Sequence, residues 1–267
     1  MLLMPAGIPQ LSQDSIRKGP GMSLDSIKKT SMRAFTVLVF LAALFCLFPP
    51  NTFSRVIAHD TMGLKGQKLM LRAETRGRLF SQGGELVEFF VDGKSIGKTL
   101  SGGDGVAFKP FTPARTGLHQ IRVTSAEDED TGLLLSVKRG SNIVFVDVQA
   151  SLLESLFSLT PKAGSQKAIG EIHKRFPIVF LQTGFVGMRV IKAWLKENEF
   201  EALPLIPWSE GAIFDEIAEK DLRIKAIIAG PRVIESAKAH QPLSFSFEAV
   251  DDAEKVKDWE EISKKLK

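Results

Sequence analysis

Short apolar runs recur at roughly ten-residue spacing between about residues 60 and 138, and Gly- and Asp-rich segments separate them. The runs are 68–73, 86–91, 105–108, 119–123 and 133–137. Runs of this length and spacing predict a small antiparallel β-sandwich. Asp92-Gly93 predicts a tight hairpin, because this pair readily takes up the positive φ angles of a type I′ turn.

From residue 141 the pattern changes to nearly continuous apolar strands that alternate with amphipathic helices. Strands are expected at 142–147, 178–182, 203–206, 224–229 and 243–247, and helices at 160–175, 187–198, 213–219, 233–239 and 251–266. Apolar strands with helices between them are typical of a parallel sheet covered on both faces. The sequence therefore predicts a three-layer α/β domain with a parallel sheet, preceded by the small all-β sandwich.

The N-terminal region has a third pattern. Residues 34–48 carry no charge, follow Lys28, Lys29 and Arg33, and end at two prolines. This length fits a signal-peptide core better than a membrane span, and cleavage before His59 is one outcome. The alternative is an uncleaved signal anchor. The expected organisation is an N-terminal extension with a signal peptide or anchor at 1–58, a sandwich at 59–140 and an α/β domain at 141–267.

Charge and cysteine usage narrow the classes of function. Residues 1–58 hold six basic and two acidic residues of the 35 and 31 in the chain, which leaves 29 of each sign afterwards. A neutral body has no electrostatic footprint for nucleic acid. The single cysteine lies in the apolar segment, so the body has no disulfide. The acidic run 127–130 is expected to be a solvated turn rather than a calcium site.

Candidate chemistry centres on Asp147, at the end of the first apolar strand after residue 141. In an open α/β sheet ligands bind beyond the carboxyl ends of the strands, so Asp147 lies where a ligand-binding or catalytic residue is expected. A buried Asp at a strand end can instead cap a neighbouring helix. A second strand, 178–182, is followed by Thr183-Gly184, where the Thr183 hydroxyl can cap a helix.

The segments Asp147-Val148-Gln149-Ala150-Ser151 and 178–184 together resemble the first two motifs of the haloacid dehalogenase (HAD) superfamily. The resemblance implies a phosphate site formed by Ser151, Thr183 and Gly184, and a catalytic group in which Asp147 is the nucleophile, with Gln149 and Thr183 beside it. That family has a second acid where this chain has Gln149. A Gln side chain cannot shuttle the proton that general acid–base catalysis requires.

The third and fourth motifs of the family are matched less closely. The resemblance implies a charge-neutralising Lys, for which Lys220 and Lys225 are both candidates. The fourth motif is similar to the run 227–235, in which Pro231 replaces one acid and Glu235 the other. Magnesium would then have only Asp147, Glu235 and a backbone carbonyl, so at most weak binding is expected.

Two wider resemblances complete the expectation. The strand and turn order of residues 86–121 resembles bacterial immunoglobulin-like domains. The absence of a cap insertion resembles the lipin-type, capless phosphatase branch, whose members act on large substrates.

Two functions follow from these resemblances. In the first, the protein is exported and its impaired HAD-like domain acts as a binding or scaffold module. In the second, it is a divergent magnesium-dependent phosphatase that uses an aspartyl nucleophile on lipid or protein phosphomonoesters. The protein is expected in the periplasm, secreted, or anchored to the membrane through its N-terminal segment alone. Its partner would be an unknown protein or lipid of the cell envelope.

Overall fold

The structure, a computed structural model, describes residues 55–77, 80–155, 158–184 and 186–266. These residues belong to one compact unit, Thr52–Lys267. The expected signal segment lies outside them. Among the described residues, no helix is long and apolar enough to cross a membrane.

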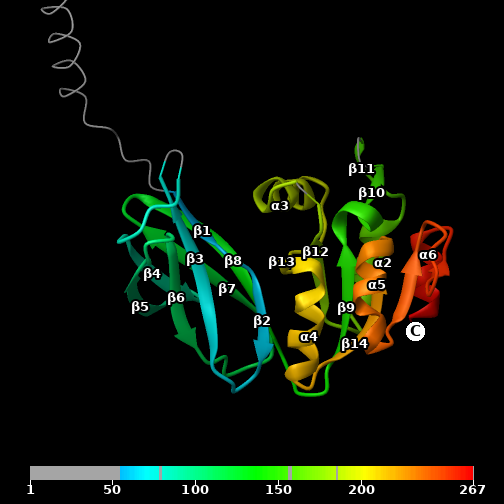
Figure 1. Cartoon of the computed structure of the whole chain (residues 1–267), viewed down its shortest axis with the longest axis horizontal. Coiled ribbons are helices and arrows are strands. Elements are labelled where there is room, and N and C mark those ends of the chain that lie inside the picture. The colour runs from blue at the N-terminus through cyan, green and yellow to red at the C-terminus, as the bar shows by residue number, and fades with distance from the viewer. Residues whose placement is uncertain (1–54, 78–79, 156–157, 185, 267) are drawn as a thin grey trace, which may run out of the picture. The chain divides into compact units, whose positions relative to one another are not determined.

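The N-terminal half of this unit is a β-sandwich of two sheets (Figure 1). Its strands are β1 Arg55–Ala58, β2 Thr61–Leu64, β3 Leu69–Arg76, β4 Leu86–Val91, β5 Lys94–Leu100, β6 Val106–Phe111, β7 Gly117–Ser125 and β8 Asp128–Val137. One sheet has the order β1-β3-β6 and is antiparallel, and the other has the order β2-β8-β7-β4-β5. The second sheet is mixed rather than antiparallel, because β2 pairs with β8 in parallel. Alternate side chains fill the space between the sheets, among them Val56, Leu71, Phe89 and Ile121.

Two predictions for this half have different outcomes. The Asp92-Gly93 hairpin is confirmed, since both residues have positive φ and join β4 to β5. The solvated turn predicted at 127–130 is correct for Glu127 alone, which lies in a turn and is exposed. Asp128 and Asp130 lie in β8, and their carboxylates accept hydrogen bonds from Val56 N and Ala58 N at 2.8 and 2.9 Å. The acids therefore hold edge strand β1 in place.

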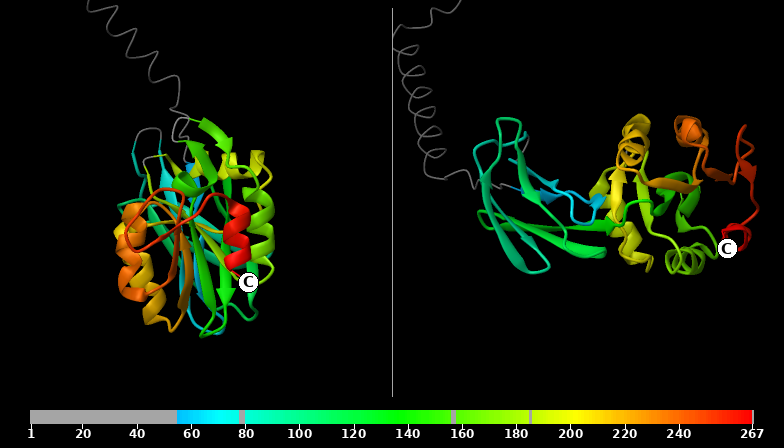
Figure 2. Two further views of the ribbon diagram at one scale, coloured as in Figure 1. Left: turned by 90° about the vertical axis from the view of Figure 1, so that its right-hand side faces the viewer. Right: turned by 90° about the horizontal axis from the view of Figure 1, so that it is seen from below.

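The C-terminal half contains a six-stranded sheet with the order β13-β12-β9-β14-β15-β16, in which the neighbouring strands pair in parallel. Its strands are β9 Asn142–Asp147, β12 Ile178–Gln182, β13 Leu205–Pro207, β14 Arg223–Ile228, β15 Leu243–Ser246 and β16 Glu254–Lys255, and its helices are α2 Ser165–His173, α3 Met188–Glu197, α4 Ala212–Glu219, α5 Pro231–Ala237 and α6 Trp259–Lys265. Val144 packs with α2, α3 and α6, whereas Phe145 packs with α4 and α5. Figure 2 shows α4 and α5 on one side of the sheet and α6 on the other. Central strand β9 is buried on both faces, which explains its unbroken apolar sequence.

The predicted fold class is nevertheless wrong for this chain. Strands make up 42% and helices 25% of the structure, and the sheets of β1 to β8 are antiparallel or mixed. Among the described residues, parallel pairs other than β2 with β8 occur only in the sheet of residues 142–255.

Two expected helices begin later than predicted. Residues 158–161 form strand β11, which pairs with β10, Leu153–Ser155, so Pro161 ends a hairpin instead of starting a helix. Helix α2 begins at Ser165, after Gly164. The last helix begins at Trp259, since the Asp258 carboxylate accepts a hydrogen bond from Glu261 N at 2.9 Å.

Asp60 ties the two halves together. Its side chain is only 1% exposed, and its Oδ1 lies 2.7 Å from Lys192 Nζ of α3. Its carboxylate also accepts hydrogen bonds from Leu133 N in β8 at 2.9 Å and from Leu205 N in β13 at 2.8 Å. One carboxylate therefore joins strands of both halves to a helix.

Candidate functional site

Asp147 is the residue around which the predicted site is built. It ends β9, is 3% exposed, and is followed by a single π-helical turn at Val148–Leu152. Its Oδ1 accepts hydrogen bonds from Gln149 N at 3.0 Å, Ala150 N at 3.2 Å and Thr183 Oγ1 at 2.8 Å. The side chain thus caps the turn that follows it and fastens that turn to the end of β12.

The structure brings Gln149 and Gly184 to the same place. Gln149 is buried, and its Oε1 accepts a hydrogen bond from Gly184 N. A Cβ on Gly184 would collide with the Gln149 amide, so a larger residue here would require the Gln149 side chain to move. Asp147, Gln149, Thr183 and Gly184 therefore form one hydrogen-bonded cluster at the carboxyl ends of β9 and β12.

Ser151 does not face this cluster. It is fully buried, and its hydroxyl donates to Ile228 O at 2.8 Å. Its carbonyl oxygen accepts a hydrogen bond from Trp259 Nε1 at 3.0 Å. Ser151 thus links the π-helical turn to β14 and α6. Its hydroxyl donates its hydrogen to Ile228 O and therefore does not point to a phosphate site at Asp147.

Neither candidate lysine is brought to Asp147. Lys225 lies at an irregularity between Ile224 and Ala226, which pair with Ile143 and Val144. That level is about 10 Å along the strand from Asp147. Its Nζ lies 6.0 Å from the centre of the Phe176 ring.

Lys220 lies near the amino-terminal ends of β9 and β14, whereas Asp147 lies at the carboxyl end of β9. It follows α4 and precedes the start of β14, where Arg223 pairs with Asn142 at the start of β9. Its Nζ is paired with Glu216 at 2.5 Å. The sequence could not choose between the two lysines, and the structure places neither of them at the carboxyl end of β9.

Glu235 lies in the second turn of α5 and is exposed. Gly230, which precedes this helix, donates its N–H to Asp147, so Glu235 lies about 7 Å further along the helix axis. Among the residues that the structure describes, no group of three or more His, Cys, Asp or Glu side chains could hold a metal ion. N–H and O–H donors surround Asp147, and magnesium wants about six oxygen ligands. The residues present do not fit the metal.

The pKa of Asp147 also argues against a role as nucleophile. Burial raises the pKa of Asp147 above its ordinary value, although hydrogen bonds from the Thr183 hydroxyl and from backbone N–H groups act in the opposite direction. A nucleophilic carboxylate must be ionised and within reach of its substrate. The environment of Asp147 disfavours the ionised form and leaves 3% of the residue exposed.

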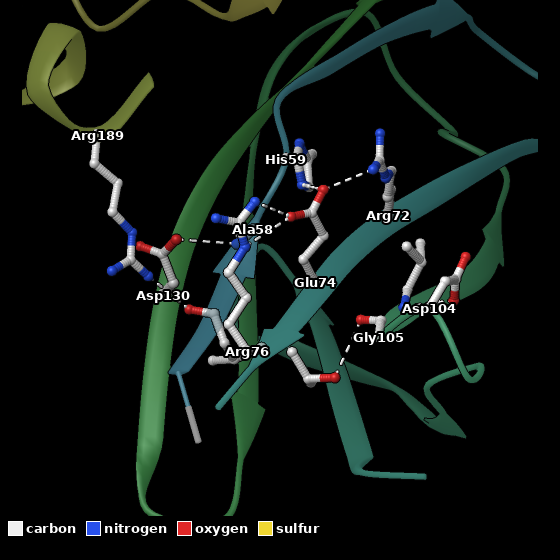
Figure 3. A network of polar contacts seen from close by, with 12 residues as sticks. Ala58, His59, Arg72, Glu74, Arg76, Asp104, Gly105, Asp130 and Arg189 are labelled. Atoms are coloured by element: carbon white, nitrogen blue, oxygen red, sulfur yellow. Dashed lines mark hydrogen bonds and ion pairs between the residues drawn. The ribbon is translucent and has the colours of Figure 1, made fainter. Parts of the chain in front are cut away.

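A second polar cluster, which the sequence analysis missed, lies on the β1-β3-β6 sheet (Figure 3). The Glu74 carboxylate lies 2.6 Å from Arg72 Nη2, 2.9 Å from Arg76 Nη2 and 3.0 Å from His59 Nε2. Burial opposes ionisation of Glu74, but the hydrogen bond from Arg76 and the neighbouring positive charges hold its pKa below the ordinary value. Burial is also the main cause that lowers the pKa of His59. In the sequence, the alternating charges of Arg72, Glu74 and Arg76 were the signal that could have predicted this cluster.

No family model matches the chain, and no curated protein matches it. Among solved structures, it is similar to the CARDB domain of the PF1109 protein from Pyrococcus furiosus, with 14% identity over 32% of this chain and 94% of that chain and a TM-score of 0.26. It is also similar to the D00-D0 domain of intimin, with 16% identity over 31% and 46% of the two chains and a TM-score of 0.26. A third similar structure, of fibronectin(III)-like modules of Clostridium thermocellum CbhA, has 18% identity over 33% and 48% of the chains and a TM-score of 0.25.

The two predicted resemblances have different outcomes. Strands β1 to β8 form a sandwich of two sheets, which is the coarse feature of the immunoglobulin-like prediction. The assignment to the HAD superfamily and its lipin-type branch is wrong, because no family model matches the chain and the structure brings neither Lys220 nor Lys225 to Asp147. With TM-scores near 0.26 over about a third of the chain, the similar structures carry no argument about activity.

Proposed function

We propose that this protein is an exported binding or scaffold module of the cell envelope, in which the Asp147 cluster has a structural role. Its immunoglobulin-like sandwich and its C-terminal half form one unit, tied together by Asp60. The N-terminal segment would deliver this unit to the periplasm, release it outside the cell, or hold it at the membrane. The partner would be a protein or a lipid of the envelope.

The observation that supports the proposal is the engagement of Asp147. One oxygen of a 3% exposed residue accepts three hydrogen bonds from the protein itself. An acceptor in this position stabilises the turn after β9 whether or not a ligand is bound. Replacing the carboxylate by an amide keeps an acceptor oxygen at this position, so a structural role is partly retained.

Cell fractionation and cross-linking test the proposal. The full chain should be recovered from the envelope or the medium, and Asp147→Asn should show the same location and the same cross-linked products. Asp147→Ala, which removes the acceptor, is the matched control for loss of structure. Recovery of the wild-type chain only from the cytoplasm would overturn the proposed location. Cross-linked products that vanish in a folded Asp147→Asn variant would overturn the structural role.

A further inference from the structure

The outward face of the β1-β3-β6 sheet concentrates arginine and apolar side chains. In β3, Leu71, Ala73 and Thr75 are buried, so Met70, Arg72, Glu74 and Arg76 point outward. The register sets Arg55 opposite Arg76, Phe108 opposite Arg72 and Pro110 opposite Met70. We call the outward side chains of Arg55, Met70, Arg72, Glu74, Arg76 and Phe108 the arginine face.

This face carries a net positive charge in an otherwise neutral body. Glu74 is its single carboxylate, and it pairs with both Arg72 and Arg76. Arg55 has no hydrogen-bond or ion-pair partner among the described residues, and it lies directly across from the like charge of Arg76. Like charges opposite each other destabilise a sheet, so the arrangement favours an external anion.

Exposed apolar side chains flank the charges. Met70 and Phe108 are each 49% exposed. Arginine combined with exposed apolar side chains suits the boundary between lipid headgroups and acyl chains, where the guanidinium meets phosphate and the apolar part enters the boundary layer.

If the N-terminal segment is not cleaved, the length of the chain limits how far this face can lie from the membrane. Strand β1 begins at Arg55, seven residues after the charge-free segment 34–48 ends. Seven residues span at most about 25 Å. If segment 34–48 stays in the bilayer, the sheet that contains β1 is held within that distance of the headgroups. Tethering raises the effective concentration of the surface, so a weak electrostatic contact is enough to orient the domain.

We propose that the arginine face docks on an anionic phospholipid surface and fixes the orientation of the domain at the membrane. This inference rests on the membrane-anchored form of the proposed function, in which the N-terminal segment is not cleaved and Arg55 is retained. The face carries two net positive charges once Glu74 is counted against the three arginines. Anionic lipid should therefore favour the docked orientation on the order of 30-fold over neutral lipid.

The test uses the full chain with Cys46→Ser, which removes the one native cysteine, and Pro110→Cys, opposite Met70 and outside the six face residues, to carry a fluorescent label. The protein is placed in nanodiscs of phosphatidylcholine alone, or with about one third phosphatidylglycerol, a composition that gives a negative surface potential. A spin label in the lipid headgroup region quenches the fluorophore only when the face is docked. We expect quenching in the anionic discs, little in the neutral discs, and loss of the difference at high salt.

Two variants distinguish binding by the arginine face from a general effect of the protein's net charge. Arg55→Gln, Arg72→Gln and Arg76→Gln together should abolish the quenching in anionic discs. The matched control removes three basic residues from strands β5 and β7 of the other sheet, through Lys94→Gln, Lys98→Gln and Arg122→Gln, and should keep it. Thermal unfolding shows whether both variants fold, and the salt dependence of the unmutated face tests the proposal without any arginine substitution.

The outcomes are distinguishable. Equal quenching in both kinds of disc, or quenching that survives the triple arginine variant, would overturn docking by this face. Failure of the full chain to copurify with neutral discs would instead refute membrane anchoring by the N-terminal segment. In that case, binding of the released chain to anionic vesicles still tests the face, and absence of such binding refutes it.

Discussion

Replacement of Asp60 by alanine should destabilise the protein strongly, because this carboxylate serves both halves. The change removes the partner of Lys192 and the acceptor of two backbone N–H groups, those of Leu133 and Leu205. The N–H of Leu205 is buried, and the Lys192 side chain is 31% exposed. The lysine regains water in the variant, whereas the buried N–H does not.

The magnitude follows from these exposures. A buried donor left without an acceptor costs about 1–3 kcal/mol. Breaking a fully buried ion pair costs about 3–5 kcal/mol, a figure that must be reduced here because Lys192 is partly solvated. We expect a total loss of about 3–4 kcal/mol for Asp60→Ala. For a unit of this size, such a loss lowers Tm by about 10 °C.

Calorimetry and a double-mutant cycle check this prediction. Asp60→Asn keeps an acceptor oxygen and should lose less than Asp60→Ala, and Lys192→Met isolates the contribution of the ion pair. A loss for Asp60→Ala below about 1 kcal/mol, the value of an exposed ion pair, would refute the reasoning.

Three further predictions concern other parts of the unit. A chain that begins at His59, as signal cleavage there would leave it, lacks β1 with its buried Val56 and should be about 3 kcal/mol less stable in urea than the chain that includes β1; equal midpoints would contradict this. Gly184→Ala should cost about 1–3 kcal/mol, because its Cβ meets the Gln149 amide. Gln149→Ala should relieve that cost, and additive losses in the double variant would count against the collision. Since the pKa of Asp147 is raised on folding, its contribution to stability is fully present below its unfolded pKa and is lost as pH rises through the folded pKa. The stability of wild type relative to Asp147→Asn should therefore fall as pH rises across that window, and a flat or rising difference would refute the assigned shift.

The sequence predicted those features that depend on local pattern. Residues 142–147 are apolar at successive positions because both faces of β9 are covered, and this predicted a central strand. The side chains of Asp147 and Thr183 meet because their strands pair in parallel and end at the same edge. The apolar pattern of the strands and their parallel direction were sufficient to predict that Asp147 and Thr183 lie together.

Features that depend on long-range register could not be predicted. The acids of β8 read as a solvated turn, since nothing local shows that Asp128 and Asp130 replace backbone acceptors for a strand 72 residues away. The choice between Lys220 and Lys225 needed the alignment of β14 against β9. A short motif match also implied a family that the whole structure does not support.

Hydrolysis of a generic phosphomonoester by the full chain, with and without magnesium, tests the structural role of Asp147 most directly. The account predicts that turnover by the folded wild-type protein does not exceed that of Asp147→Asn under either condition, while Asp147→Asn unfolds at a different midpoint. Magnesium-dependent turnover that disappears in a folded Asp147→Asn variant would contradict the account and make Asp147 a nucleophile.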